Sequence, residues 1–187
     1  SLSQLLTNPR YSIHYYQREY KWQEEQISQL LSDLFSSFYS YYPSRGSSTV
    51  SVADFGYYFM GTVIVIQKST GEQDQAIIDG QQRMTSFTLL ILYLQNRLMD
   101  LGLNPRNDIE GLLRTNGRDN ISFNDATRKE VIRAIRDRSP EIEGKSTSAI
   151  FMAARYRNIQ RILDEELTQE SIPVFFEWIL GHVLFVK

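Results

Sequence analysis

The chain has 187 residues, of which 42% are hydrophobic and 22% are charged, and its formal net charge is −2. This composition is typical of a globular protein with one substantial core. The absence of Cys and the presence of only two His exclude disulfides, thiolate metal sites, an HNH-type nuclease centre and a multi-histidine metal site. We therefore predict no metal centre made by the protein alone.

The charge balance also limits the partners. Non-specific DNA affinity comes largely from neutralised phosphates, so a chain with a net charge of −2 is not expected to wrap DNA. Any DNA contact is expected to be local or supplied by another domain. The longest apolar runs are far shorter than the roughly 20 residues that a membrane helix needs, and no signal peptide is recognised. A cytoplasmic location without membrane contact is the expectation.

The N-terminal segment carries an aromatic box. After one expected helical turn over residues 3–7, five aromatic residues fall between Tyr11 and Trp22, in a segment expected to be irregular or extended. These rings either anchor a loop to the core or stack on a base, since stacking needs only an aromatic face. Gln17 and Arg18 are less easily core residues, and an Arg beside a Gln points to a carboxylate or a phosphate.

An amphipathic helix is predicted over residues 23–39. Its apolar residues recur at three- and four-residue spacing, and Glu24 and Glu25 favour a helix start. The residues of the expected buried stripe are Ile27, Leu30, Leu31, Leu34, Phe35 and Phe38. The Ser- and Gly-rich residues 43–54 are expected to form a mobile surface loop or a lid.

Two β-branched segments, residues 57–67 and 75–78, are predicted to form a hairpin or neighbouring strands, separated by a turn at residues 69–72. They deliver Asp79 to the edge of a small sheet. The residues from Gly80 to Leu101 are apolar nearly all round, which predicts a central buried helix with Gly102 as its C-cap. The change from strand-like to helical patterns near residue 80 predicts an α+β fold.

Beyond residue 104 the pattern becomes helical and charged. Helices are predicted over residues 125–138, capped by Asn124 or Asp125, and over residues 148–169, with a last short helix starting at Pro173. Residues 182–187 are expected to form a strand whose partner lies either in this domain or elsewhere. The basic residues of the two longer helices form either a solvated face or a surface for nucleic acid or protein. They are Arg128, Lys129, Arg133, Arg136, Arg138, Arg155, Arg157 and Arg161.

The most informative segment joins the second strand to the buried helix, at residues 77–85 with the sequence IIDGQQRMT. Unpaired N–H groups at a helix start lie at the positive end of the helix dipole, so a strand–glycine–helix turn is a natural anion site. A purely local interpretation is also open, in which Asp79 is the N-cap and Gln82 completes a capping box. That interpretation leaves Arg83 unexplained, because a cation in the first turn opposes the dipole.

Residues 79–83, with the sequence DGQQR, resemble the signature of a domain family of unknown function. This family forms the N-terminal part of GmrSD-type, modification-dependent restriction enzymes and related phage-defence proteins. Residues 13–22, IHYYQREYKW, are similar to the family's N-terminal box, in which a proline is common where this chain has His14. Residues 58–66, YFMGTVIVI, fit the family's glycine-containing strand. The three matches occur in order over residues 11–94.

The resemblance implies a small mixed sheet like that of the ParB and sulfiredoxin superfamily, packed on helices and followed by a mostly helical C-terminal part. It divides the chain into residues 1–103, which carry a nucleotide site, and a helical extension over residues 104–187. The implied nucleotide-binding residues are Gln17, Arg18, Gly80, Gln81 and Arg83. The implied catalytic residues are Asp79, Gln82 and Arg83.

The implied ligand is a nucleoside triphosphate (NTP) of unknown base, accompanied by Mg²⁺. The residues leave three roles open for Asp79: it orients Arg83, positions a water, or contacts Mg²⁺ through water. No Walker-A sequence is present, which excludes a P-loop mechanism.

The first hypothesis is therefore an NTP-binding and NTP-hydrolysing regulatory domain of a restriction or phage-defence protein. DNA is expected to be contacted mainly through other domains, and a homo-oligomer is a further expectation. Whether this chain hydrolyses NTP by itself stays open. The second hypothesis is a non-catalytic DNA-binding or protein-interaction module that uses the basic helices. Direct nuclease action is disfavoured, because no carboxylate cluster or His pair of metal-site type stands out.

Overall fold

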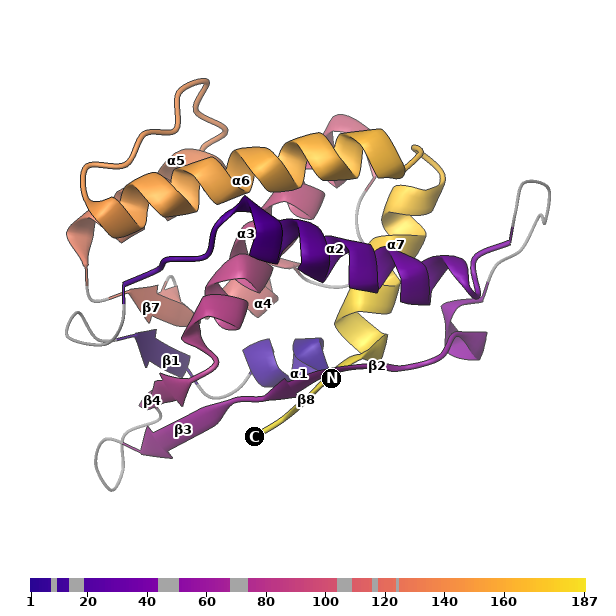
Figure 1. Cartoon of the computed structure of the whole chain (residues 1–187), viewed down its shortest axis with the longest axis horizontal. Helices are drawn as coiled ribbons and strands as arrows, with labels where there is room; N and C mark the ends of the chain where they lie inside the picture. Colours follow the sequence, from indigo (N-terminus) through magenta and orange to yellow (C-terminus); the bar gives the residue numbers. More distant parts are fainter. Residues whose placement is uncertain are drawn as a thin grey trace.

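The computed structural model describes residues 1–7, 10–13, 19–43, 51–67, 74–103, 109–115, 118–123 and 125–187. Long helices α2 and α6 lie side by side above α3, and the strands lie below α3 (Figure 1). The elements follow in the order α1 (Leu2–Thr7), β1 (Arg10–Ile13), α2 (Glu24–Tyr39), η1 (Val52–Asp54), β2 (Tyr58–Thr62), β3 (Ile64–Gln67), β4 (Asp74–Asp79), α3 (Gln81–Asp100), α4 (Ile109–Leu113), β5 (Arg114–Thr115), β6 (Arg118–Asp119), β7 (Ile121–Phe123), α5 (Ala126–Arg136), α6 (Thr147–Glu166), α7 (Ser171–His182) and β8 (Val183–Val186). This arrangement confirms the α+β prediction.

A four-stranded mixed sheet has the strand order β3-β4-β1-β7. Strand β1 is parallel to both of its neighbours, whereas β3 runs antiparallel to β4. The predicted hairpin is therefore present as β3 and β4, although the turn predicted at residues 69–72 lies outside the described residues. Because β1 and β4 are parallel, their carboxyl ends, at Ile13 and Asp79, lie at the same end of the sheet.

The strand predicted over residues 57–67 is divided in two. Strand β2 ends at Thr62, Val63 is buried, and β3 begins at Ile64 in a different sheet. Strand β2 pairs in parallel with β8, and the N–H of Val63 donates to the carbonyl of Val186 at 2.8 Å. The prediction of one sheet containing all of residues 57–67 is thus wrong, because β2 pairs with the C-terminal strand instead.

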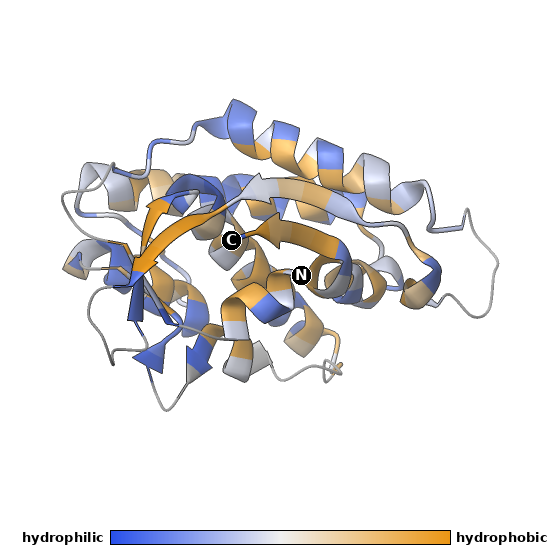
Figure 2. Cartoon of the chain, turned by 90° about the horizontal axis from the view of Figure 1, so that it is seen from below, coloured by the Kyte–Doolittle hydropathy of each residue, from blue (hydrophilic) through white to orange (hydrophobic). Residues whose placement is uncertain are grey.

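The predicted C-terminal strand is confirmed, and its partner lies inside this domain. Strand β8 ends beside the C-terminus as a strongly hydrophobic ribbon (Figure 2). Two strand pairs cross residue 103, since β7 pairs with β1 and β8 with β2. The division into residues 1–103 and 104–187 stays a prediction.

Helix α3 is the central helix, as predicted. Residues 84–94 are all buried, and the helix contacts α5, α6 and α7. Its end is set by Gly102, which has a φ of +67°. The N–H groups of Gly102 and Leu103 donate to the carbonyls of Met99 and Leu98, which is the Schellman arrangement that satisfies the last carbonyls of a helix.

The buried stripe predicted for α2 is confirmed at all six positions. The rings of Phe38 on α2 and Phe175 on α7 lie edge to face, with 5.0 Å between their centroids. Of the loop predicted over residues 43–54, residues 44–50 lie outside the described residues. Val52–Asp54 forms a 3-10 turn with Val52 buried, so this part is regular and is anchored by Val52, and its mobility stays a prediction.

The basic helices are only partly solvated. Arg128 and Arg155 are 4% and 9% exposed, so the interpretation of a solvated face is wrong for these two residues. The guanidinium of Arg155 donates to the carbonyl of Trp22 at 3.2 Å, which ties α6 to the aromatic box. Pro173 is the third residue of α7 rather than its first. None of the described helices combines the length and apolarity needed to cross a membrane.

The cap of α5 gives a testable prediction. The carboxylate of Asp125 accepts hydrogen bonds from the N–H groups of Thr127 and Arg128 at 2.8 and 3.3 Å. Burial alone would raise the pKa of Asp125, but these bonds, the Thr127 hydroxyl and the charge of Arg128 outweigh it and lower the pKa below 3.8. We expect Asp125→Ala to lower the free energy of unfolding by about 0.5–2 kcal/mol at neutral pH.

Because the pKa is lower in the folded state, the carboxylate stabilises the fold above the ordinary Asp range, and this contribution disappears as the pH falls through the folded pKa. Urea denaturation at pH 7 and pH 3 measures both effects. Asp125→Asn should keep the cap and lose the pH dependence. Asp137→Ala, at the other end of α5, is the control and should cost little. Equal losses for Asp125→Ala and Asp137→Ala would contradict the cap assignment.

Candidate functional site

The chain passes from β4 into α3 through a single glycine. Gly80 has φ +90° and ψ 5°, a left-handed conformation that glycine adopts without strain. A Cβ at this position would lie 3.1 Å from a methyl group of Val63, a tight contact that Val63 would have to relieve by a small shift. The carbonyl of Gly80 accepts the N–H of Met84 at 2.9 Å, which closes the first helical turn. The predicted strand–glycine–helix turn is present.

The capping box proposed for this turn is not formed. Asp79 is the last residue of β4, and α3 has no side-chain cap. Gln82 bonds elsewhere: its side-chain oxygen accepts the N–H of Lys21 and its side-chain nitrogen donates to the carbonyl of Glu19, both at 2.9 Å. Gln82 therefore joins the DGQQR turn to the chain that follows Arg18.

The first turn of α3 keeps free donors. Within the described part of the chain, the backbone N–H groups of Gln81, Gln82 and Arg83 have no acceptor. They lie at the positive end of the dipole of a 20-residue helix. The buried side chain of Gln81 donates to the carbonyl of Ile77 at 2.8 Å and so turns back toward β4. The turn thus offers three backbone donors that no described group occupies.

Arg83 has two backbone partners that sequence analysis missed, and it lies near Asp79, a contact that sequence analysis had offered as one possibility. Its guanidinium donates to the carbonyls of Met60 and Thr62 at 3.0 and 2.8 Å, and it lies 3.6 Å from a carboxylate oxygen of Asp79. We call this set the Arg83 clamp. It explains a cation in the first turn without a bound anion. Two carbonyl bonds occupy only part of a guanidinium that has five N–H groups, so Arg83 keeps donors for a further oxygen.

Gly61 makes room for the Arg83 clamp. The pairing of β2 with β8 slips by one residue between Phe59 and Gly61, which is a β-bulge at Met60. Gly61 has φ +109°, and a Cβ there would collide with the guanidinium of Arg83. The one sequence signal for this contact is a glycine inside a β-branched run, a pattern that marks bulges and close approaches.

The aromatic box is anchored to the core where it is described. Tyr11 and Tyr20 are buried. The hydroxyl of Tyr20 shares a 2.9 Å hydrogen bond with the hydroxyl of Ser86 on α3. The backbone N–H of Tyr20 donates to the hydroxyl of Ser148 on α6 at 2.7 Å. Burial raises the pKa of Tyr20 above its ordinary value, so the hydroxyl stays protonated. For these two rings the anchoring interpretation is the right one.

Gln17 and Arg18 lie outside the described residues, as does His14, so their approach to Arg83 stays a prediction. The chain on either side of them is described. It ends β1 at Ile13, beside β4, and resumes at Glu19, whose carbonyl meets Gln82. The two sequence boxes therefore meet in space through residues 19–21 and Gln82.

The fold and this turn define an α+β domain. In this domain a glycine turn places the start of a buried helix at the carboxyl end of an inner strand of a mixed sheet. Residues 2–180 match the family model for the N-terminal domain of the GmrSD restriction endonuclease, and the chain belongs to this family. Membership puts the chain in the context of DNA restriction and phage defence. A search of the curated proteins finds no match to the chain.

The contact between Gly61 and Arg83 gives the second prediction. Gly61→Ala should lower the free energy of unfolding by about 1–3 kcal/mol through backbone strain, and by more because the new methyl group displaces Arg83. In an Arg83→Ala background the displacement has no cost. We therefore expect the double variant to be less destabilised than the sum of the single variants, by at least about 0.5 kcal/mol.

Gly102→Ala is the matched control, since Gly102 also has a positive φ but an added Cβ would meet nothing within 4 Å. Gly102→Ala should lower the free energy of unfolding by roughly 1–2 kcal/mol. Its effect and that of Arg83→Ala should add in the double variant. Chemical denaturation of the six proteins measures the cycle. Additive costs at Gly61 would mean that the guanidinium does not occupy the space over this glycine.

Proposed function

We propose that this domain binds an NTP at the turn from Asp79 to Arg83 and acts as a nucleotide-dependent regulatory domain of a restriction enzyme. The observation that carries the proposal is the uncapped first turn of α3, with three backbone N–H groups free of acceptors in the described chain. Such donors, at the positive end of a helix dipole, are the recurring chemistry of phosphate sites in proteins.

Each motif residue has a distinct part in this proposal. Gly80 lets the phosphates approach the backbone, and Gln81 and Arg83 offer N–H groups to them. Arg83 is held in place by two carbonyls before any ligand arrives, so little entropy is lost when its remaining donors bind a phosphate oxygen. Gln82 acts as a positioning residue, because it fixes the backbone at residues 19–21 beside the turn.

Gln17 and Arg18 complete the proposed site. They immediately precede the segment that Gln82 fixes, which supports their approach to the same ligand. A second arginine beside Arg83 would be tolerated once a polyphosphate lies between the two guanidinium groups.

For hydrolysis, Asp79 is the carboxylate of the turn itself. Its side chain is 63% exposed and lies 3.6 Å from Arg83, so it can position a water or contact Mg²⁺ through water. No group of three or more metal-ligating side chains occurs among the described residues. We therefore propose that Mg²⁺ enters with the NTP, held mainly by the phosphates, as is usual for this ion.

Thermal unfolding with and without nucleotide tests the proposal. We expect Mg²⁺ with one or more of ATP, GTP, CTP and UTP to raise the melting temperature, because a ligand at 100 times its Kd stabilises a protein by about 2.7 kcal/mol. Arg83→Ala should abolish this shift and also lower the melting temperature of the free protein. Asp79→Asn should keep the shift and lose any hydrolysis, measured as phosphate release.

The matched control is Arg97→Ala, which removes an arginine from the last turn of the same helix, where it pairs with Asp164. It should weaken the free protein and leave the nucleotide shift intact. An Arg83→Ala protein that unfolds more easily but keeps the full shift would show that the Arg83 clamp is purely structural. Absence of any shift with all four nucleotides would favour the alternative of a binding module without nucleotide chemistry.

A further inference from the structure

A second cationic site lies far from the DGQQR turn. A cavity of about 370 Å³ opens between α5, the β5–β6 hairpin and the first residues of β1 and β4. Its cationic residues are Arg10, Arg114, Arg118, Lys129, Arg133 and Arg136, against the two carboxylates of Asp74 and Asp119. The chain as a whole is weakly acidic, with a net charge of −2. Positive charge is therefore concentrated in this basic cavity.

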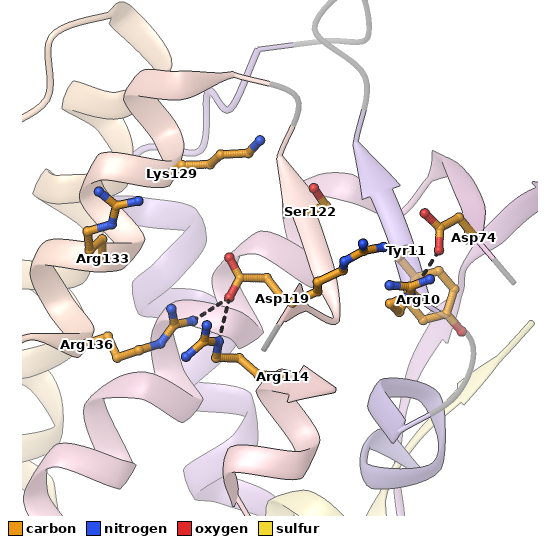
Figure 3. A pocket seen from close by; sticks show the side chains of 10 residues that line it. Arg10, Tyr11, Asp74, Arg114, Asp119, Ser122, Lys129, Arg133 and Arg136 are labelled. Atoms are coloured by element: carbon orange, nitrogen blue, oxygen red, sulfur yellow. Dashed lines mark hydrogen bonds and ion pairs between the residues drawn. The ribbon is translucent and has the colours of Figure 1, made fainter. Parts of the chain in front are cut away.

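The two carboxylates of the basic cavity are already engaged. Asp74 lies 3.0 Å from Arg10, and one oxygen of Asp119 lies 2.8 Å from Arg136 and 3.7 Å from Arg114 (Figure 3). These pairs hold three arginines in fixed positions around the cavity.

The other three cations lie outside the ion pairs formed by the described residues. Arg118, Lys129 and Arg133 are exposed, and none of them has a carboxylate partner among the described residues. Like charges gathered in one hollow repel one another, and a bound anion removes that cost. The cavity thus has a built-in preference for a ligand with several negative charges.

The spacing of the cations favours an extended anion. Lys129, Arg133 and Arg136 follow one another along α5 at intervals of four and three residues, so they share one face of the helix. The stripe is about 10 Å long, from the helical rise per residue. One DNA strand carries a phosphate about every 3.4 Å along the helix axis, with a longer distance along the winding backbone itself, so the stripe is long enough to contact about two successive phosphates. Ser122, on β7, adds a hydroxyl to the lining (Figure 3).

The basic cavity is separate from the proposed nucleotide site. It contains Asp74, the first residue of β4, whereas the DGQQR turn begins at Asp79, the last residue of that strand. The two ends of β4 are about 17 Å apart, at the usual rise per residue in a strand. A single bound nucleotide cannot use the N–H groups of α3 and the stripe on α5 through the same phosphates.

We infer that the basic cavity is a docking site for the phosphodiester backbone of duplex DNA. Arginine and lysine side chains that are pre-positioned by neighbouring carboxylates form charge-assisted hydrogen bonds to phosphate oxygens. Contacts of this kind fix the register of a protein on DNA and carry no sequence information. The contact is local, as a chain with this net charge requires, and the inference does not depend on nucleotide binding at the DGQQR turn.

The test compares two charge-matched triple variants. The cavity variant combines Arg118→Gln, Lys129→Gln and Arg133→Gln, which break no ion pair in the described structure. The control variant combines Lys145→Gln, Arg157→Gln and Arg161→Gln, which remove three exposed cations from α6 and the segment before it. Both variants change the net charge equally. Affinity for a duplex of arbitrary sequence is measured by fluorescence anisotropy over a range of salt concentrations.

We expect the slope of log affinity against log salt to fall by about 1 for each cavity cation removed, and by the same amount for unrelated sequences. The control variant should keep the wild-type slope. Because repulsion is relieved, the cavity variant should also melt at or above the wild-type temperature at low salt. Equal slopes for the two triple variants, or wild-type protein that does not bind duplex DNA, would overturn the inference.

Two further arms identify the source of the phosphate and separate this proposal from the previous one. Inorganic tripolyphosphate should stabilise the wild type more than the cavity variant, because any anion with several negative charges relieves the repulsion among the cavity cations. If it stabilises only the wild type while DNA binding is the same in both, the cavity is a site for small polyphosphates and the DNA assignment falls. The nucleotide shift should survive in the cavity variant, and the DNA salt slope should survive in Arg83→Ala, so either proposal can fail alone.

Discussion

The burial of α3 on nearly every side is the constraint on which the rest of the structure depends. In its first turn the side chain of Gln81 is buried and those of Gln82 and Arg83 are half-buried, and all three bond to other segments. Gln81 bonds to β4, Gln82 bonds to residues 19–21, and Arg83 bonds to β2. One helical turn thereby bonds to the strand that precedes it and to two segments that are distant in sequence.

Features encoded by neighbouring residues could be predicted from the sequence, and features that depend on remote backbone atoms could not. The stripe of α2, the burial of α3 and the cap at Asp125 follow from short-range spacing. Two of the partners of Arg83 are backbone carbonyl groups. Because every residue has a carbonyl, no sequence pattern predicts which ones Arg83 contacts. For Gln82, two arrangements compete for one side chain: a capping box within the turn, and hydrogen bonds to residues 19–21. The hydrogen bonds to residues 19–21 form instead of the capping box. The pairing of β2 with β8 was hidden because a β-branched run fits either sheet equally well.

The site followed the same division. Sequence alone located the turn, its glycine and the free helix start, all of which are local. It interpreted Arg83 as a cation awaiting an anion, whereas the structure gives it carbonyl partners that are compatible with a ligand but do not require one. The basic cavity was beyond sequence reasoning, because its cations come from a strand, a hairpin and a helix. Three of the six cations lie on one face of α5. The other three lie on strands that the tertiary structure places beside α5. On the two proposals made above, β4 separates nucleotide chemistry at one end from DNA contact at the other.

The pairing of β2 with β8 has a consequence for how the protein is made. Residues 58–62 obtain their strand partner only when residues 183–186 exist. During synthesis, which adds about 5–20 residues per second, β2 cannot pair until more than a hundred further residues have left the ribosome. The bulge that accommodates Arg83 cannot form before that pairing. Loops of this length close slowly, and the waiting strand is an unpaired apolar edge throughout. Until β8 is translated, residues 58–62 therefore offer an unpaired strand edge to other chains.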